Sequence, residues 1–186
     1  MEQGMLFDKI KKIGIVPVVK LEDAQDAKPL AKALCDGGLP CAEVTFRTEA
    51  AEESIHLMAE QFPDMLVGAG TVLTKEQVDA AAAGARFIVS PGFDPEIVDY
   101  CLEKEIPVYP GCVSPSEVAQ AVKRGLKFMP TGGINAKNLE EYLSCDKIIC
   151  CGGSWMVKGD LVKAGEFDKI QELTAEARKL VDSIRK

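Results

Sequence analysis

The chain has 186 residues, of which 47% are hydrophobic, and its formal net charge at pH 7 is -7. This length is enough for one well-buried domain, and we expect residues 1–186 to form a single domain. The acidic charge, with no basic run longer than two residues, argues against nucleic acid or a membrane surface as a partner. No signal-peptide pattern opens the sequence and no apolar run has the length of a membrane span, so we expect a soluble cytoplasmic protein.

Seven cysteines and one histidine limit the chemistry that the chain can carry out. The number of cysteines is odd and none forms a C-x-x-C pair, which favours reduced thiols packed as small core residues over a metal or redox role. His56 lies in an expected helix over 49–62 and is interpreted as a surface or packing residue. A histidine-rich metal site is thereby excluded, so acid–base work should fall to carboxylates and covalent work to lysine or cysteine.

Short β-branched and apolar runs alternate with segments of helical periodicity, which is typical of a parallel sheet with helical crossovers. Three helix starts are marked by N-terminal caps at Thr74, Asp94 and Ser114. Asn135 is expected to cap the helix that follows the first glycine pair. The expected strands cover residues 13–19, 41–46, 65–70, 87–90, 107–110, 126–130 and 147–151.

Two glycine groups near the end of the chain favour a closed (β/α)8 TIM barrel over an open doubly wound sheet. Gly132-Gly133 follow the strand expected at 126–130, and Gly152-Gly153-Ser154 follow the strand at 147–151. Such glycines let backbone N–H groups face a phosphate, and a helix starting just beyond adds its positive dipole end. Phosphate sites after the last two strands recur in barrels. Only seven strand–helix units are recognisable, however, one fewer than a complete barrel has.

The strand expected at 41–46 carries charged side chains on one face. Alternation places Cys41, Glu43, Thr45 and Arg47 on one side of the strand, and its other side is apolar and should face the helices. The charged set should then face the mouth of the barrel, where a buried carboxylate is costly unless it is paired or used. We prefer Glu43 as general acid or base and Arg47 as a carboxylate-binding fork. The alternative is a structural Glu43–Arg47 ion pair.

Further candidate residues lie in or after other expected strands. Thr71 follows Gly68-Ala-Gly70, whose small residues leave room for a substrate oxygen, and Pro91 lies in the similar turn Ser90-Pro-Gly92. Both segments could equally be structural turns. Lys127 is the only lysine in the interior of an expected strand, and a dry barrel interior would favour the neutral amine that attacks carbonyl groups. The alternative is a solvated lysine at the start of a strand.

Taken together, these segments resemble the 2-keto-3-deoxy-6-phosphogluconate / 4-hydroxy-2-oxoglutarate (KDPG/KHG) aldolase family. The resemblance implies a trimeric (β/α)8 barrel and a class I aldolase without metal or other cofactor, in which a lysine forms a Schiff base with pyruvate or with the aldol. It implies an acid/base role for Glu43, pyruvate binding by Arg47 and Thr71, and a phosphate site at the two glycine groups. Pro91 is a further substrate-binding candidate. The matching segments are Gly14-Ile-Val-Pro-Val-Val19, Glu43-Val-Thr-Phe-Arg-Thr48, Gly68-Ala-Gly-Thr-Val-Leu73, Ile88-Val-Ser-Pro-Gly92, Pro130-Thr-Gly-Gly-Ile134 and Gly152-Gly-Ser-Trp155.

The chain departs from the family's pattern at the lysine. Members resembling this chain have a sixth strand similar to Lys-Phe-Phe-Pro-Ala-Glu and, after a helix, a seventh similar to Lys-Phe-x-Pro-Thr-Gly-Gly. Here one strand, Leu126-Lys-Phe-Met-Pro-Thr-Gly-Gly133, follows the fifth helix directly, so one strand–helix unit is missing. The surviving strand matches the seventh, and Lys127 lies roughly 13–17 Å before its glycine pair, away from the carboxyl end where barrel chemistry takes place. Lys20, at the end of the first strand, lies closer than Lys127 to the carboxyl end where this chemistry takes place.

Two functions follow from this comparison. The first is aldol cleavage of 2-keto-3-deoxy-6-phosphogluconate to pyruvate and glyceraldehyde 3-phosphate, or of 4-hydroxy-2-oxoglutarate to pyruvate and glyoxylate, with Lys127 as nucleophile. The second is an impaired or truncated family member that binds a phosphorylated ligand without cleaving it. A metal-dependent aldolase or phosphosugar isomerase is disfavoured by the single histidine. In the first two cases the expected partner is a small-molecule keto acid, and the resemblance implies a homotrimer.

Overall fold

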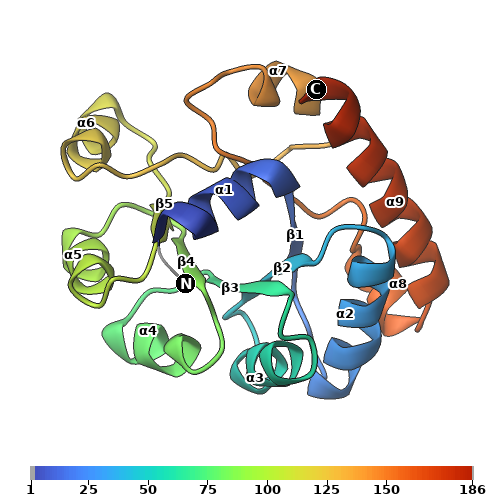
Figure 1. Cartoon of the computed structure of the whole chain (residues 1–186). Coiled ribbons are helices and arrows are strands. Elements are labelled where there is room, and N and C mark those ends of the chain that lie inside the picture. Colours follow the sequence, from blue (N-terminus) through green and yellow to red (C-terminus); the bar gives the residue numbers. More distant parts are fainter. Residues whose placement is uncertain (1–2, 186) are drawn as a thin grey trace.

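A computed structural model of the chain describes residues 3–185 and shows a curled parallel sheet surrounded by helices (Figure 1). Every strand pairing in it is parallel, and the strand order is β5-β4-β3-β2-β1-β6. Each of the first four strands therefore pairs with the next strand in sequence, as short helical crossovers require, and β6 pairs with β1. The strands are β1 (Ile15–Val19), β2 (Cys41–Thr45), β3 (Leu66–Gly70), β4 (Phe87–Ser90), β5 (Val108–Pro110) and β6 (Cys151–Gly153).

Helices cover the outside of the sheet, and three of the four helix starts predicted from N-terminal caps form as expected. Thr74 and Asp94 accept hydrogen bonds from the backbone N–H groups of Gln77 and Glu96, and Ser114 forms a full capping box. No helix among the described residues is long and apolar enough to cross a membrane. The helices are α1 (Gln3–Ile13), α2 (Ala27–Asp36), α3 (Ala51–Gln61), α4 (Lys75–Ala82), α5 (Pro95–Glu103), α6 (Pro115–Lys123), α7 (Leu139–Leu143), α8 (Gly159–Lys163) and α9 (Phe167–Ile184), with a 3₁₀ turn η1 (Ala24–Asp26) before α2.

The expected cap at Asn135 is wrong, because α7 begins only at Leu139 and Asn138 is its N-cap residue. Asn135 Oδ1 instead accepts a hydrogen bond from the N–H of Lys137, which forms a local turn. The single histidine, His56, is exposed on α3, in agreement with its interpretation as a surface residue.

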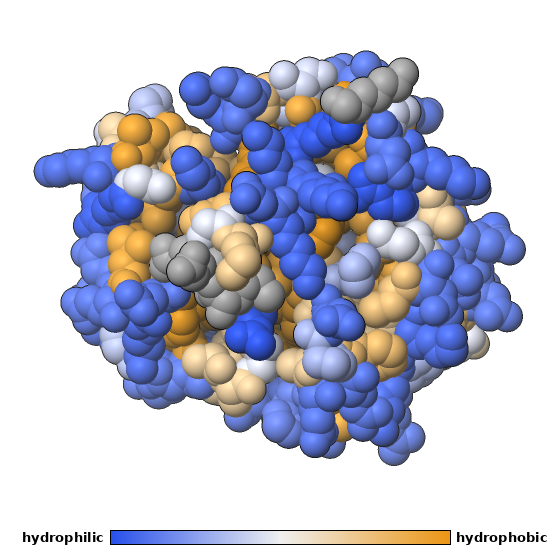
Figure 2. Space-filling model, viewed as in Figure 1, coloured by the Kyte–Doolittle hydropathy of each residue, from blue (hydrophilic) through white to orange (hydrophobic). Residues whose placement is uncertain are grey.

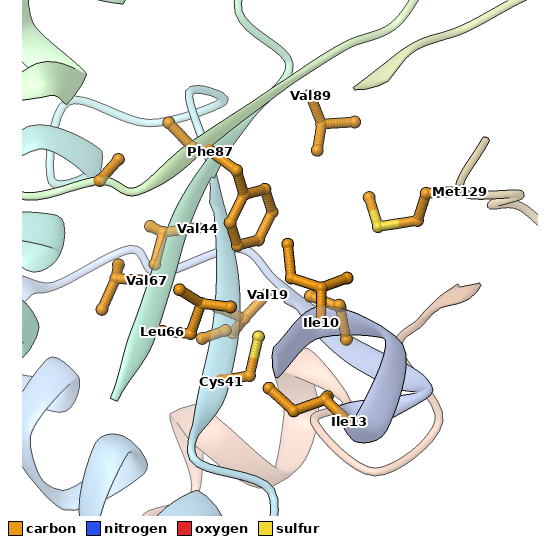
Figure 3. Close-up of a cluster of buried hydrophobic side chains, with 14 of the residues drawn as sticks. Ile10, Ile13, Val19, Cys41, Val44, Leu66, Val67, Phe87, Val89 and Met129 are labelled. Carbon is orange, nitrogen blue, oxygen red and sulfur yellow. The ribbon is translucent and has the colours of Figure 1, made fainter. Parts of the chain in front are cut away.

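The hydrophobic core fills the inside of the curled sheet, and α1 lies across the amino-terminal end of the strands (Figure 1). Figure 3 shows Ile10 and Ile13 of α1 near Cys41 of β2, with Phe87 and Met129 around the same interior. Core packing of the cysteines is confirmed for four of them and not for Cys145, which is exposed. The four buried cysteines are Cys41, Cys101, Cys150 and Cys151.

The first five expected strands form, but the last two differ. The segment expected as a strand at 126–130 makes only an isolated bridge, from Phe128 to Ile148, and the strand expected at 147–151 forms at Cys151–Gly153 instead. The N–H groups of Ile149 and Gly152 donate to the carbonyl oxygens of Phe128 and Pro130, so segment 128–130 lies beside β6. Within residues 3–185, no hydrogen bond joins β5 to this segment. The sheet is therefore open between β5 and residues 128–130.

Helix α6 lies at this open side and leaves part of its apolar face uncovered. Val118 and Val122 are 39% and 59% exposed, whereas Ala121 is buried. Figure 1 shows α6 separated from α7, and hydrophobic surface is visible on the side of the molecule that carries α5 and α6 (Figure 2). An amphipathic helix normally covers its apolar face with the sheet beneath it, so these valines mark a place where packing is missing.

Candidate functional site

A cavity of about 530 Å³ opens at the carboxyl ends of β1, β2 and β6. It brings Arg47 together with both glycine groups, which come from segments more than eighty residues later in the chain. Three cations line it against a single carboxylate, so the cavity is locally positive although the chain is acidic. The polar and glycine residues that line it are Lys20, Thr45, Arg47, Gly132, Gly133, Gly152, Gly153, Ser154, Lys158, Gly159 and Asp160.

Glu43 lies in the middle of β2, below this cavity, and is only 4% exposed. Its Oε2 atom is buried without a hydrogen-bond partner among the described residues. A β-carbon at Gly70 of the neighbouring strand β3 would overlap Oε1 of Glu43, so the glycine makes room for the carboxylate. The space that Gly70 provides is thus filled by a protein carboxylate, and the room expected there for a substrate oxygen stays a prediction.

Burial raises the pKa of Glu43 to about 7, against the opposing effect of the positive charge on Arg47. An ordinary glutamate is almost fully ionised at neutral pH, whereas a group with this pKa is present in both protonation states. Such a carboxyl group can both donate and accept a proton near neutral pH, as general acid–base catalysis requires.

Arg47 forms a hydrogen bond with Thr71 and no ion pair with Glu43. Its Nε donates a hydrogen bond of 3.1 Å to Thr71 Oγ1, and the ion pairs found within residues 3–185 include neither Arg47 nor Glu43. The alternative of a structural Glu43–Arg47 ion pair is therefore not supported. Because Arg47 has no carboxylate partner among the described residues, its guanidinium remains able to bind a carboxylate from a ligand.

Thr71 has a strained backbone at the end of β3. Its φ angle is 58°, in the left-handed region that a β-branched residue rarely adopts. Strain of this kind costs on the order of 1–3 kcal/mol and tends to occur at functional sites. Here it accompanies the hydrogen bond to Arg47, which links the two expected pyruvate-binding residues across the ends of the neighbouring strands β2 and β3.

The two glycine groups are required for different physical reasons. Gly132 and Gly133 have φ angles of 79° and 72°, yet a β-carbon at either would meet nothing within 4 Å, so their requirement is conformational. Gly152 and Gly153 lack room instead: a β-carbon on Gly152 would lie 2.7 Å from Cγ2 of Thr131, and one on Gly153 would overlap the ring of Trp155.

The groups that could hold an anion at this end of the cavity are backbone amides and cationic side chains. The N–H groups of Gly132 and Gly133 donate no hydrogen bond within the described chain. The expected contribution of helix dipoles is small, because α7 and α8 have only five residues each and neither starts directly after its glycine pair.

Lys127 does not reach this site. It lines a second cavity of about 640 Å³ together with Phe7, Asp8 and Lys11 of α1, at the amino-terminal end of the strands. The strand register explains this position. Phe128 bridges Ile148, which lies three residues before Cys151, the partner of Ile15. Glu43 pairs with Val18, which lies three residues after Ile15.

Lys127 therefore lies about seven strand positions below Glu43, or roughly 23 Å along the strands. The prediction of Lys127 as the Schiff-base residue has no geometric support, because a single lysine side chain cannot cover that distance.

Pro91 and Lys158 differ in their position relative to the cavity. Pro91 is exposed in the turn after β4 and does not line the 530 Å³ cavity. Lys158, just before α8, lines the cavity beside the second glycine group and was missed by sequence reasoning. The signal that could have found it is its place in the loop that directly follows Gly152-Gly153-Ser154.

Comparison with protein families gives a match to the KDPG and KHG aldolase family over residues 6–128 and 121–173. The two ranges overlap at 121–128, so this segment matches two separate parts of the family's sequence pattern. A 2-dehydro-3-deoxy-phosphogluconate aldolase of Treponema pallidum is 39% identical, with 95% of this chain and 97% of that protein covered. That alignment has 204 positions, more than the 186 residues of the chain, so it must contain a gap in this chain. Both observations agree with the loss of one strand–helix unit.

Solved structures of this family also match most of the chain. The KDPG aldolase of Legionella pneumophila, with pyruvate captured as a covalent carbinolamine intermediate, matches with a TM-score of 0.86 and 36% identity, covering 91% of this chain and 96% of that one. The corresponding enzyme of Zymomonas mobilis ZM4, with 3-phosphoglycerate, matches with a TM-score of 0.83 and 32% identity over 94% and 95% of the two chains. The elements on both sides of the opening therefore keep the arrangement of these relatives.

Proposed function

Since the chain belongs to the KDPG and KHG aldolase family, we propose that it cleaves a 2-keto-4-hydroxy acid to pyruvate and an aldehyde through a lysine Schiff base. The substrate would be 2-keto-3-deoxy-6-phosphogluconate, giving glyceraldehyde 3-phosphate, or 4-hydroxy-2-oxoglutarate, giving glyoxylate. The observation that carries the proposal is Glu43: a buried carboxyl group with a pKa of about 7, directly below a positive cavity.

The cavity suggests how such a substrate would lie. Its carboxylate would bind Arg47, held by Thr71, with the keto carbon above Glu43. A phosphate at the far end would meet the backbone amides of Gly132 and Gly133 and the segment Gly152–Ser154, with Lys158 beside them. Pro91 would contact the substrate only if the bound ligand extended beyond the cavity toward β4.

Glu43 would move the protons of the reaction. In its acid form it would protonate the leaving hydroxyl of the carbinolamine, and in its basic form it would take the proton of the 4-hydroxyl group as the carbon–carbon bond breaks. The same carboxyl group would return a proton to the enamine carbon before hydrolysis releases pyruvate. A pKa near 7 suits both directions of transfer.

We propose that residues 1–186 form a single domain, a TIM-type (β/α)8 barrel that lacks one strand–helix unit. We propose further that the chain acts in the cytoplasm as a homotrimer, as the family resemblance implies. Sedimentation equilibrium would test the assembly: a mass of three chains is expected, and a monomer at micromolar concentration would contradict it.

A second candidate is a protein that binds the keto acid without cleaving it. The position of Lys127 at the opposite end of the strands favours this alternative. Pyruvate release from each substrate, measured with a lactate dehydrogenase couple, separates the two, with calorimetric titration of pyruvate run in parallel. Cleavage supports the aldolase, binding without cleavage supports the second candidate, and the absence of both contradicts the site assignment.

A further inference from the structure

Lys20 lies directly after β1, at the carboxyl edge of the sheet. Val18 and Val19 pair with Glu43 and Val44 of β2, so the next residue, Lys20, lies level with Thr45. Side chains alternate along a strand and paired residues point to the same face. Lys20 therefore has the orientation of Val18, Glu43 and Thr45, and it lines the 530 Å³ cavity with Val18 and Thr45.

Only one other lysine among the described residues lines this cavity, namely Lys158. The strand order β2-β1-β6 places Lys20 on the neighbour of the strand that carries Glu43, whereas Lys158 follows the strand beyond it. Lys158 also stands beside the second glycine group, where a cation would serve the phosphate. Lys20 is thus the lysine nearest in register to the acid/base carboxyl group.

The present contact of Lys20 leaves it free to move. Its Nζ forms an ion pair of 2.6 Å with Glu22 Oε1, and the two side chains are 49% and 68% exposed. Exposed pairs of this kind contribute little to stability and exchange readily with other partners. The four-carbon stem of lysine can therefore turn from Glu22 into the cavity at small cost.

We propose that Lys20 supplies the amine of the Schiff base in this chain, a role that rests on the proposed aldolase function. The ammonium first loses a proton to solvent, and Nζ then adds to the keto carbon as the C=O π bond breaks. The proton that the nitrogen releases passes to the oxygen, which gives the neutral carbinolamine. Glu43 protonates the hydroxyl group, which leaves as water as the nitrogen lone pair forms the iminium double bond.

The remaining steps use the same two residues, Lys20 and Glu43. The carbon–carbon bond of the aldol breaks toward the iminium nitrogen, giving an enamine and an aldehyde, while Glu43 takes the 4-hydroxyl proton. The enamine carbon then recovers a proton from Glu43, and water hydrolyses the iminium to pyruvate and the free amine of Lys20.

Reductive trapping tests this assignment. The full chain is incubated with pyruvate and sodium borohydride and then mapped by peptide mass spectrometry, beside Lys20→Arg and the control Lys127→Arg. Arginine keeps the positive charge and the contact with Glu22 but cannot form a Schiff base, and thermal unfolding verifies that each variant is folded. We expect a carboxyethyl group on Lys20 in the original chain and in Lys127→Arg, and none in Lys20→Arg, whose cleavage rate falls by about 1,000-fold or more.

The outcomes separate the failure of Lys20 from the failure of the proposed function. An adduct on another lysine, or undiminished cleavage by Lys20→Arg, overturns the role of Lys20 and leaves the aldolase standing. If the original chain shows no adduct and no cleavage, both the role of Lys20 and the aldolase function are overturned. Pyruvate titration of the same Lys20→Arg sample adds a readout that is independent of turnover: noncovalent binding through Arg47 should persist within about 3-fold.

Discussion

The carboxyl group of Glu43 occupies the space that a side chain at Gly70 would fill. We expect Gly70→Ala to destabilise the fold by about 1–3 kcal/mol, because the new methyl group overpacks against a buried carboxyl group. In a Glu43→Ala background the same substitution should cost markedly less, giving a coupling of about 1 kcal/mol or more in a double-mutant cycle measured by urea unfolding.

Gly68→Ala is the matched control for this cycle. A β-carbon at Gly68 would overlap the ring of Phe87 and does not approach Glu43. Its destabilisation should therefore add to that of Glu43→Ala within about 0.5 kcal/mol. Equal coupling for both glycines would contradict the space-making role of Gly70.

The raised pKa of Glu43 makes stability depend on pH in a definite direction. Between the ordinary value of 4.5 and the folded value of about 7, the folded state holds a proton that the unfolded state has lost. The free energy of unfolding should therefore fall as pH rises through this window, by up to about 3 kcal/mol from this group. Glu43→Gln cannot ionise, so its stability relative to the original chain should increase from pH 4.5 to pH 7. Urea unfolding of both proteins across this range measures the effect, and parallel pH profiles would contradict it.

Strand alternation and glycine signals act locally, so the sequence could predict the strand positions of most residues in the candidate site. Glu43 and Arg47 follow from period-two alternation in one strand, and the first five strands form where apolar runs predict them. Lys127 could not be placed in the same way. Its height in the sheet depends on the register between Phe128 and Ile148, a long-range pairing that no local pattern encodes. The late start of α7 has a local cause instead, because the side-chain amides of Asn135 and Asn138 both donate to Gly133 O and hold the intervening turn.

Alanine substitutions in the two glycine groups should respond differently to a second substitution at Thr131. Gly152→Ala clashes mainly with Cγ2 of Thr131, so Thr131→Ser, which removes that methyl group, should recover about 1 kcal/mol or more of the lost stability. Gly132→Ala meets no neighbour, and its cost of about 1–2 kcal/mol arises from a φ angle of 79°. Thr131→Ser should leave that cost unchanged. Thermal unfolding of the single and double variants checks both statements, and rescue of both alanine variants would contradict the distinction.

The open side of the sheet should tolerate polar residues on α6. Val122 is 59% exposed, so Val122→Lys should change the free energy of unfolding by less than about 0.5 kcal/mol, and it should reduce self-association by removing exposed apolar surface. Val98→Ala, at a fully buried site on α5, is the control and should cost about 2 kcal/mol. Urea unfolding and light scattering measure the two effects. A large loss of stability in Val122→Lys would show that α6 is covered in solution.

Arg47 and Lys127 should differ sharply in their effect on ligand binding. Arg47→Ala removes the guanidinium that faces the cavity and should weaken pyruvate binding by about 10–100-fold, the range expected for a charge-assisted hydrogen bond to a carboxylate. Lys127→Ala should leave the affinity unchanged, because Lys127 lines the cavity at the other end of the strands. Calorimetric titration of both variants makes the comparison within one experiment, since each replaces one cation with alanine and changes the net charge equally. Weaker binding in Lys127→Ala at unchanged thermal stability would contradict the separation of the two ends.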